Sequence, residues 1–147
     1  MTRVRSWGFT LWGAPLSVNH IYEPARKVSR RGREYTGRKL TDVAQQYRDD
    51  AQLIIGSARP SHWAPEGQVR ILWDLYLARD MDCDNAMKLV HDAIQLATGV
   101  NDARFLPCVM SKTTGVPPRA ARAEIRIVEA SGSLLQDLAT LGSTPTP

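Results

Sequence analysis

The feature that most constrains this chain is an apolar run that ends directly in a cluster of acidic residues. Residues 69–77 are rich in β-branched and aromatic side chains, which favours a strand. From about residue 85 to 98, apolar side chains recur at spacings of three and four, which favours a helix with Gly99 as its C-cap. If the chain stays extended through the junction, carboxylates at alternate positions point to one side. Three aspartates have this spacing: Asp80, Asp82 and Asp84.

The rest of the sequence predicts a fold that mixes strands and helices. We expect a second long helix from about residue 42 to 57, with a buried stripe of Val43, Tyr47, Ala51 and Ile54. Pro107 places one of the predicted strands at a sheet edge or a bulge, because proline has no N–H to donate. Further strands are expected over residues 7–12, 104–110 and 122–129. The predicted fold class is α/β or α+β, a small mixed sheet with two main helices.

Length and composition favour a single domain. We expect the 147 residues to form one domain over residues 1–130 and a partly disordered tail over 131–147, in which a helical turn or two forms. The two cysteines are too few for a disulfide framework, which favours a reducing compartment. No stretch approaches the ~20 apolar residues that a membrane helix needs, and glycine and proline interrupt the N-terminal apolar stretch, so no signal peptide is expected.

Positive charge is concentrated in one segment. The chain has a formal charge of +4 and a pI of about 9.4, which is compatible with nucleic-acid binding. Within residues 26–39, Glu34 is the single acid, and two glycines exclude a helix. Either the segment is a solvated loop, or it becomes ordered on a phosphate backbone. Its seven basic residues are Arg26, Lys27, Arg30, Arg31, Arg33, Arg38 and Lys39.

The acidic cluster has three interpretations. A calcium loop requires glycine where this chain has Asn85, and a bidentate glutamate where it has His91, so this interpretation fails. Acids that merely cap a helix account for one aspartate but not for three. The third interpretation is a Mg²⁺ site for phosphodiester chemistry, because Mg²⁺ prefers oxygen ligands and binds through one or two carboxylates and a substrate phosphate.

Residues downstream extend this prediction. Lys88 follows Asp84 by four residues, which places both on one helix face. It is suited to stabilising charge that develops during phosphoryl chemistry, although a surface ion pair would also explain it. Asp92 lies near the same side as a supporting group. Asp102 follows the helix and is either a turn residue or a further ligand.

Helix length bears on where Asp102 acts. A helix over residues 85–98 is ~21 Å long, and the three residues after it reach ~10 Å at most. Asp102 would then lie ~10 Å or more from Asp84, too far for one Mg²⁺ ion. Either the helix is shorter or bent, or Asp102 joins the site from the other subunit of a homodimer. We favour the second arrangement, because a two-fold dimer pairs two such sites.

The same residues resemble the RusA family of Holliday-junction resolvases. The family pattern is D-x-D-N, a lysine three residues after the asparagine, D-A-[LI] on the same helix, and an acidic pair that opens the next strand. Here it falls on Asp82, Asp84, Asn85, Lys88, Asp92-Ala93-Ile94 and Asn101-Asp102, where Asn101 replaces the first acid of the pair. Also similar are the family's P-x-S-x-N start and Y-R-D helix, at Pro15, Ser17, Asn19, Tyr22 and Tyr47-Arg48-Asp49.

The resemblance covers residues 9–128 and implies a homodimeric endodeoxyribonuclease. It would resolve four-way DNA junctions in recombination and repair, with Mg²⁺ or a substituting Mn²⁺, in the cytoplasm of a bacterial or phage-infected cell. Asp80 is extra to the pattern, and Asn85 and Asp92 would support the site. The implied catalytic residues are Asp82, Asp84, Asp102 and Lys88, the three aspartates being the metal ligands. DNA contacts would come from Asn19 and the seven basic residues of 26–39.

Two alternatives remain open at this stage. One is a DNA-binding relative that does not cleave, although carboxylates without a metal would repel DNA. The other is a nuclease that prefers forks or flaps, because recognition of a junction depends on the shape of the dimer rather than on any local motif.

Overall fold

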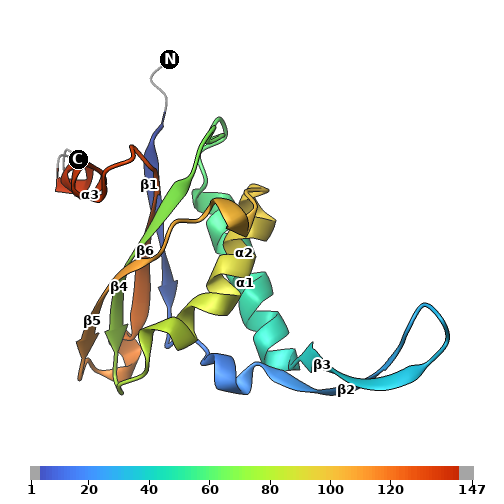
Figure 1. The fold of residues 1–147 in the computed structure, drawn as a ribbon. Helices are drawn as coiled ribbons and strands as arrows, with labels where there is room; N and C mark the ends of the chain where they lie inside the picture. Colours follow the sequence, from blue (N-terminus) through green and yellow to red (C-terminus); the bar gives the residue numbers. More distant parts are fainter. Residues whose placement is uncertain (1–3, 143–147) are drawn as a thin grey trace.

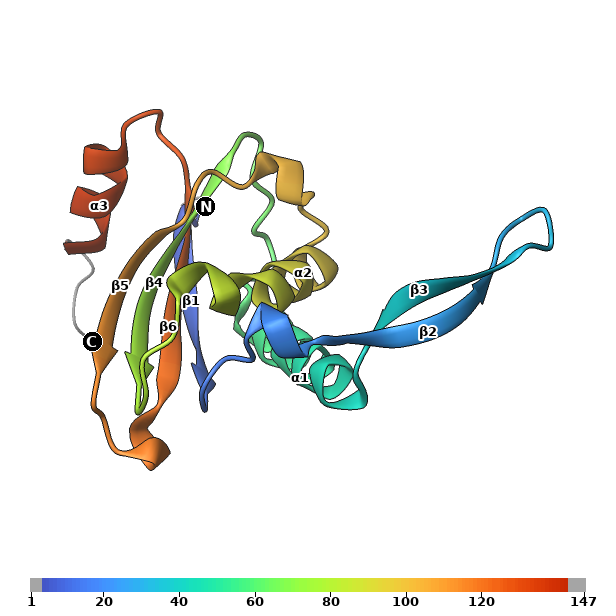
Figure 2. The same ribbon diagram turned by 60° about the horizontal axis from the view of Figure 1, so that its bottom comes forward.

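A four-stranded mixed sheet forms the centre of the molecule, and two helices pack on one of its faces (Figures 1 and 2). The computed structural model describes residues 4–142. The strand order is β1-β6-β4-β5, with β5 parallel to β4 and the other pairs antiparallel. The strands are β1 (Ser6–Trp12), β4 (Val69–Leu77), β5 (Val109–Thr114) and β6 (Arg122–Glu129). The helices are α1 (Asp42–Ala58), α2 (Met87–Thr98) and α3 (Leu134–Gly142). The mixed α+β fold class is therefore confirmed.

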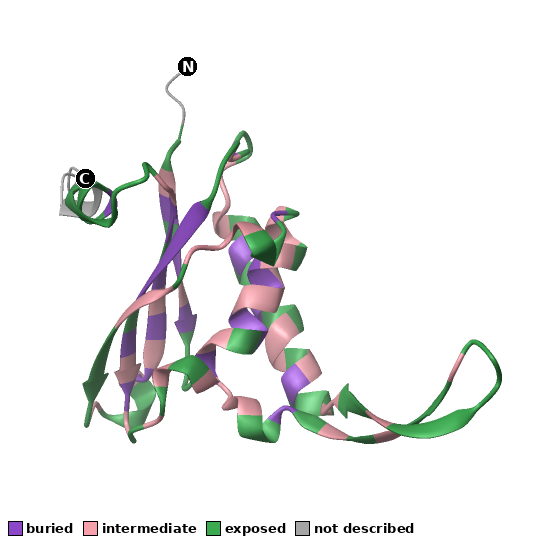
Figure 3. Ribbon diagram, in the orientation of Figure 1, coloured by how far each residue is buried: buried purple, intermediate pink, exposed green. Residues whose placement is uncertain are grey.

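Every second side chain along β1, β4 and β6 points toward the helices and forms the core. Ile71, Trp73 and Leu75 of β4 are at most 2% exposed and face the helices. Ala123, Ile125 and Ile127 of β6 and the odd-numbered residues of β1 from Trp7 to Leu11 join them in the same cluster. The opposite face is more polar, and α3 covers part of it (Figure 3).

The start of α1 and the end of α2 fall at the residues that the sequence indicates. Thr41 accepts a hydrogen bond from the backbone N–H of Ala44 and caps α1. Gly99 ends α2 at a φ of 73°, a left-handed conformation that glycine adopts without steric cost. Among residues 4–142, no helix combines the length and apolar character that crossing a membrane requires.

The predicted stripe of α1 is correct at Ala51 and at the partly buried Tyr47, and wrong by one position at Val43 and Ile54. The buried residues are Ala44, Ala51 and Ile55, whereas Val43 is 68% exposed and Ile54 is 42% exposed. The buried face carries two alanines, whose small side chains allow α2 to pack closely against α1.

The strand predicted over residues 104–110 starts later. Asp102–Arg104 forms a short 3₁₀ turn, η3, and Phe105 makes only an isolated bridge to Val69. Pro107 cannot donate to the ladder, so regular pairing begins at Val109 and extends to Thr114, four residues past the predicted end. Its position at the sheet edge is as predicted.

The basic segment is a β-hairpin rather than a loop. Strands β2 (Tyr22–Val28) and β3 (Glu34–Leu40) pair over seven residues each and project away from the sheet (Figure 2). Gly32, at a φ of 76°, provides the left-handed residue that the connecting turn needs. The two glycines excluded a helix as expected, but they did not indicate the strands.

The C-terminal helix α3 lies on the sheet face opposite α1 and α2 (Figure 1). Its Asp137 is 2% exposed and accepts a hydrogen bond from Arg70 of β4 at 2.9 Å. This contact fastens part of the predicted tail to the domain. Fraying is expected from Gly142 onward; α3 includes Gly142, and residues 143–147 lie outside the described residues.

Candidate functional site

The predicted site residues converge on a cleft along α2. Its volume is about 510 Å³, and its walls come from the turn before α2, one face of α2, and the segment that leads into β5. Polar and apolar groups share the lining: Asp84, Met87, Lys88, His91, Asp92, Asp102, Phe105, Leu106, Pro107 and Cys108. Four of the predicted residues, Asp84, Lys88, Asp92 and Asp102, therefore lie in one cleft of one chain.

The acidic junction is bent rather than extended. Strand β4 ends at Leu77, and residues 83–86 form a 3₁₀ turn, η2, before α2. Asp82 caps this turn through its backbone carbonyl, which accepts from the N–H of Asn85 at 3.2 Å, and it does not line the cleft. The extended junction on which a one-sided arrangement of Asp80, Asp82 and Asp84 depended is not found, and of the three only Asp84 lines the cleft.

Asp80 has a separate role in the structure. Its carboxylate pairs at 2.6 Å with the amine of Lys112, on the edge strand β5. The same amine donates to the backbone carbonyl of Met81 at 3.1 Å. This ion pair raises the pKa of Lys112 and lowers that of Asp80. Lys112 thus fastens the acidic junction to β5, a contact that no local sequence pattern indicates.

Lys88 pairs within the cleft, although with a different partner from the one its spacing suggested. Its amine lies 2.8 Å from the carboxylate of Asp92, one turn further along α2. That hydrogen bond raises the pKa of Lys88, and the charge of Asp102 acts in the same direction. Lys88 is therefore protonated and is held at the wall of the cleft, with the acids Asp84 and Asp102 on either side of it along the chain.

Asp102 reaches the cleft from the opposite end of α2. The carboxamide of Asn101 accepts from the N–H of Ala103 at 2.8 Å and caps the short turn that carries Asp102. Asn101, the departure from the family's acidic pair, thus has a local structural function. The helix is 12 residues long, shorter than predicted, and both Asp84 and Asp102 line the cleft.

His91 is a cleft residue that the sequence did not assign. Burial lowers its pKa, so the ring is neutral near pH 7. The imidazole packs edge-on against Phe105, with ring centroids 5.6 Å apart, and its Nε2 lies 3.5 Å from the Sγ of Cys108. Desolvation raises the pKa of Cys108 to about 11, so its thiol is protonated. The one available signal was its position three residues after Lys88, on the same helix face.

The cleft offers oxygen donors that suit a hydrated divalent ion. Asp84 and Asp102 have carboxylates on its walls, whereas the carboxylate of Asp92 is engaged by Lys88. Within residues 4–142, no three His, Cys, Asp or Glu side chains converge as ligands for a metal ion. Mg²⁺ commonly retains several waters and binds through one or two carboxylates and a phosphate, so the residues fit this mode rather than an all-protein cage.

The basic hairpin begins next to the cleft. A 3₁₀ turn, η1 (Val18–His20), carries Asn19 and lies against η2, which carries Asp84. The buried Ile21 and the partly buried Leu40 then anchor the base of the hairpin against Leu89 of α2. The predicted DNA-contacting residues are thus joined to the cleft, but they extend away from it.

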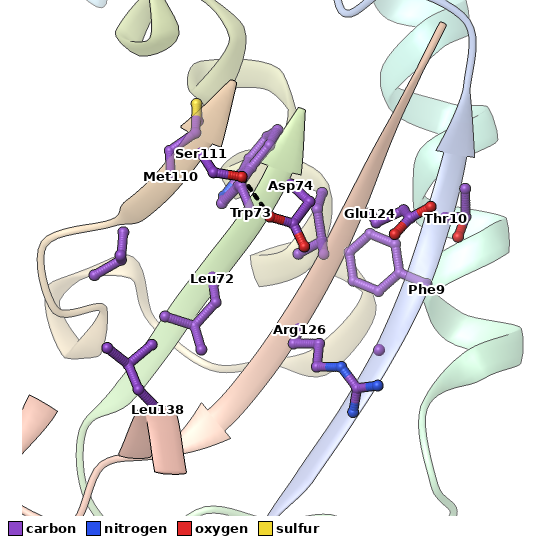
Figure 4. Close-up of a pocket in the computed structure, with 13 residues that line it drawn as sticks. Phe9, Thr10, Leu72, Trp73, Asp74, Met110, Ser111, Glu124, Arg126 and Leu138 are labelled. Atoms are coloured by element: carbon purple, nitrogen blue, oxygen red, sulfur yellow. Dashed lines mark hydrogen bonds between the residues drawn. The ribbon is translucent and has the colours of Figure 1, made fainter. Parts of the chain in front are cut away.

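A larger hollow of about 640 Å³ lies on the other face of the sheet (Figure 4). There Ser111 donates a hydrogen bond to Asp74, and Leu138 of α3 packs near Leu72. None of the residues that the sequence assigns to the site lines this hollow. We therefore locate the candidate site in the smaller cleft, where carboxylates and a lysine meet.

No protein-family model matches the chain, and a search of curated proteins finds no match.

Proposed function

We propose that this protein is a magnesium-dependent endonuclease that cleaves branched DNA, with the four-way junction as its preferred substrate. One observation carries the proposal: the carboxylates of Asp84 and Asp102 and the amine of Lys88 line a single open cleft. Similarity of the sequence to the RusA family motifs supports the junction as substrate and the homodimer as the active form.

Asp84 and Asp102 would hold the ion, with waters and a DNA phosphate completing its coordination. When bound, Mg²⁺ activates a water and neutralises charge on the phosphate. Lys88 places a fixed positive charge where the departing oxygen becomes negative, and Asp92 keeps this side chain in place through its 2.8 Å contact. Asp80 acts through its ion pair with Lys112 at the junction that leads to Asp84, and Asp82, two residues before Asp84, does not line the cleft.

The charge distribution supports a DNA substrate. An acidic cleft by itself repels a phosphate backbone, so cleavage at this position needs both a bound cation and a separate source of attraction. The hairpin, which starts beside the turn that carries Asp84, supplies that attraction.

The decisive experiment incubates the protein with labelled four-way junction, fork, flap and linear duplex, with Mg²⁺, with Mn²⁺ or with EDTA. We expect metal-dependent cuts in the junction and none in EDTA. Asp84→Asn should abolish cleavage and preserve junction binding. Asp50→Asn, the same chemical change on the exposed side of α1, serves as the matched control and should cut like the wild type.

Removal of the amine tests the second part of the mechanism. Lys88→Ala should lower the cleavage rate by roughly a hundredfold or more, the scale of one lost charge-stabilising donor. A rate within a factor of two of wild type would reduce Lys88 to a surface ion pair. Metal-independent binding without any cleavage would identify a DNA-binding protein, and preferred cleavage of forks or flaps would overturn the junction assignment.

A further inference from the structure

The net positive charge of the chain comes from one projecting element. The hairpin, residues 22–40, carries seven basic and two acidic side chains, a net charge of +5. The whole chain carries +4, so everything outside the hairpin together carries −1. Net electrostatic attraction to a polyanion therefore comes mainly from this element.

The shape of the hairpin is well defined. It is a two-stranded antiparallel ribbon from the pair Tyr22↔Leu40 to the pair Val28↔Glu34, and nearly all of it is exposed (Figure 3). At its tip, the backbone N–H of Ser29 donates to the carbonyl of Arg33 at 2.8 Å, and the Ser29 hydroxyl accepts from the Arg33 N–H. The turn thus presents its arginines on an ordered backbone.

The basic side chains occupy both broad faces of the ribbon. Cross-strand partners share a face and successive residues alternate, so Arg26 and Arg38 lie on one face and Lys27 and Lys39 on the other. Each face also carries one acid, Glu23 beside Lys39 at 2.9 Å and Glu34 on the face of Arg26 and Arg38, so the two faces are equally basic. A protein that lies flat on DNA needs charge on one face only, whereas charge on two faces and the tip suits a channel with phosphates on both sides.

The middle of the ribbon is also thin. Ala25 pairs with Gly37, and a Cβ on Gly37 would lie 2.7 Å from the Cδ of Lys27, because the lysine stem crosses the glycine. The small side chains of Ala25 and Gly37 therefore reduce the thickness of the ribbon at this pair. The exposed Val28 and Tyr35 near the tip add apolar surface that suits base edges.

These features identify a groove rather than a single backbone as the binding partner. The major groove of B-DNA is ~12 Å wide and admits a two-stranded ribbon, whereas the minor groove, at ~6 Å, does not. We propose that the hairpin inserts into the major groove of a duplex arm, with its two faces toward the phosphates of the two groove walls. The inference rests on the DNA substrate of the proposed function but not on cleavage.

The test measures binding of the full chain to duplex and junction DNA in EDTA, where no cleavage occurs. Methylation of guanine N7, which projects into the major groove, should interfere with binding at successive positions of one arm. Netropsin, a minor-groove ligand, should not displace the protein. Displacement by netropsin, or binding that is indifferent to N7 methylation, would overturn the inference.

The second test removes basic residues from the hairpin and measures the salt dependence of DNA binding. Arg26→Ala with Arg38→Ala removes two contacts and should flatten the salt dependence of binding by roughly 1.8 in the log–log slope. Between 50 and 200 mM salt, the variant should then lose roughly tenfold less affinity than the wild type. Arg119→Ala with Arg126→Ala removes the same charge from outside the hairpin and should leave the slope unchanged. Equal slopes for the two pairs would refute the assignment.

The outcomes separate this inference from the proposed function. A chain that shows N7 interference but never cuts any DNA with Mg²⁺ retains the groove contact and loses the endonuclease assignment. A chain that cuts junctions while its hairpin variants bind like the wild type retains the endonuclease and loses the groove contact. Circular dichroism of each variant verifies that the domain is folded.

Discussion

The contact between Arg70 and Asp137 predicts a large loss of stability from one substitution. The Nε of Arg70 lies 2.9 Å from Oδ2 of Asp137, and the backbone N–H of Ser131 donates to Oδ1 at 2.9 Å. The two side chains are 10% and 3% exposed. Asp137→Ala therefore leaves a guanidinium buried without its partner under α3, and it also removes the acceptor for Ser131.

The expected magnitude follows from burial. Removing one member of a buried ion pair costs about 3–5 kcal/mol. For a chain of this size, each kcal/mol lowers the melting temperature by roughly 2–4 °C, so Asp137→Ala should melt roughly 10 °C below the wild type. Replacing both residues with apolar side chains, Arg70→Met with Asp137→Leu, should recover most of the loss, because no charge then remains buried.

The same contact predicts an acid dependence. Desolvation raises the pKa of Asp137, but the hydrogen bonds from Arg70 and Ser131 outweigh it, so the folded-state pKa lies below the ordinary value. The stabilisation is therefore complete above the unfolded-state pKa of ~3.9 and is lost as pH falls through the folded-state pKa. Urea titrations across this range test both points. A melting temperature lowered by less than 3 °C would refute the burial argument.

Three further predictions concern the junction, the cleft and the sheet. Lys112→Ala should raise the Mg²⁺ concentration needed for cleavage, because the substitution removes the contacts that hold Asp80 and Met81 to β5. Lys112→Arg should restore the wild-type Mg²⁺ dependence. If Lys112→Ala needs the same Mg²⁺ concentration as the wild type, Lys112 has no positioning role. Because Asp84 and Asp102 line the cleft of one chain, verified mixed dimers of Asp84→Asn and Asp102→Asn should not nick, and nicking at about a quarter to a half of the wild-type level would instead place Asp102 across the dimer. Gly8→Ala would bring its Cβ to 2.8 Å from a backbone oxygen of β6 and should cost about 1–3 kcal/mol, so an unchanged urea midpoint would contradict the packing.

The elements that the sequence predicted well are those whose burial follows a simple period. The nine apolar-rich residues of β4, the alternation of β6 and the 3–4 spacing of α2 each reflect one buried face. The hairpin has no buried face along most of its length, so no hydrophobic period could indicate it. Its remaining signal was turn chemistry at Ser29 and Gly32, which is short and ambiguous.

Some residues of the candidate site could also be placed from local spacing, whereas others could not. The placement of Lys88 and Asp92 on one helix face follows from spacing alone, and the structure brings both to the cleft. Lys112, about thirty residues further along the chain, contacts the acidic junction, so no local pattern could show that only Asp84 of its acids lines the cleft. The surroundings of His91 likewise depend on contacts that form only in the folded chain.

The isolation of the hairpin from the core has a dynamic consequence. Among the described residues, β2 and β3 pair only with each other, and a two-stranded ribbon has little stability of its own beyond its anchored base. Amide protons toward Ser29 should exchange with solvent through local opening, whereas those of α2 exchange only when the core opens. The hairpin can therefore bend toward an approaching polyanion. This motion increases the distance from the core at which the protein first contacts the polyanion. The cleft lies along α2, which packs in the core and does not need to move during that encounter.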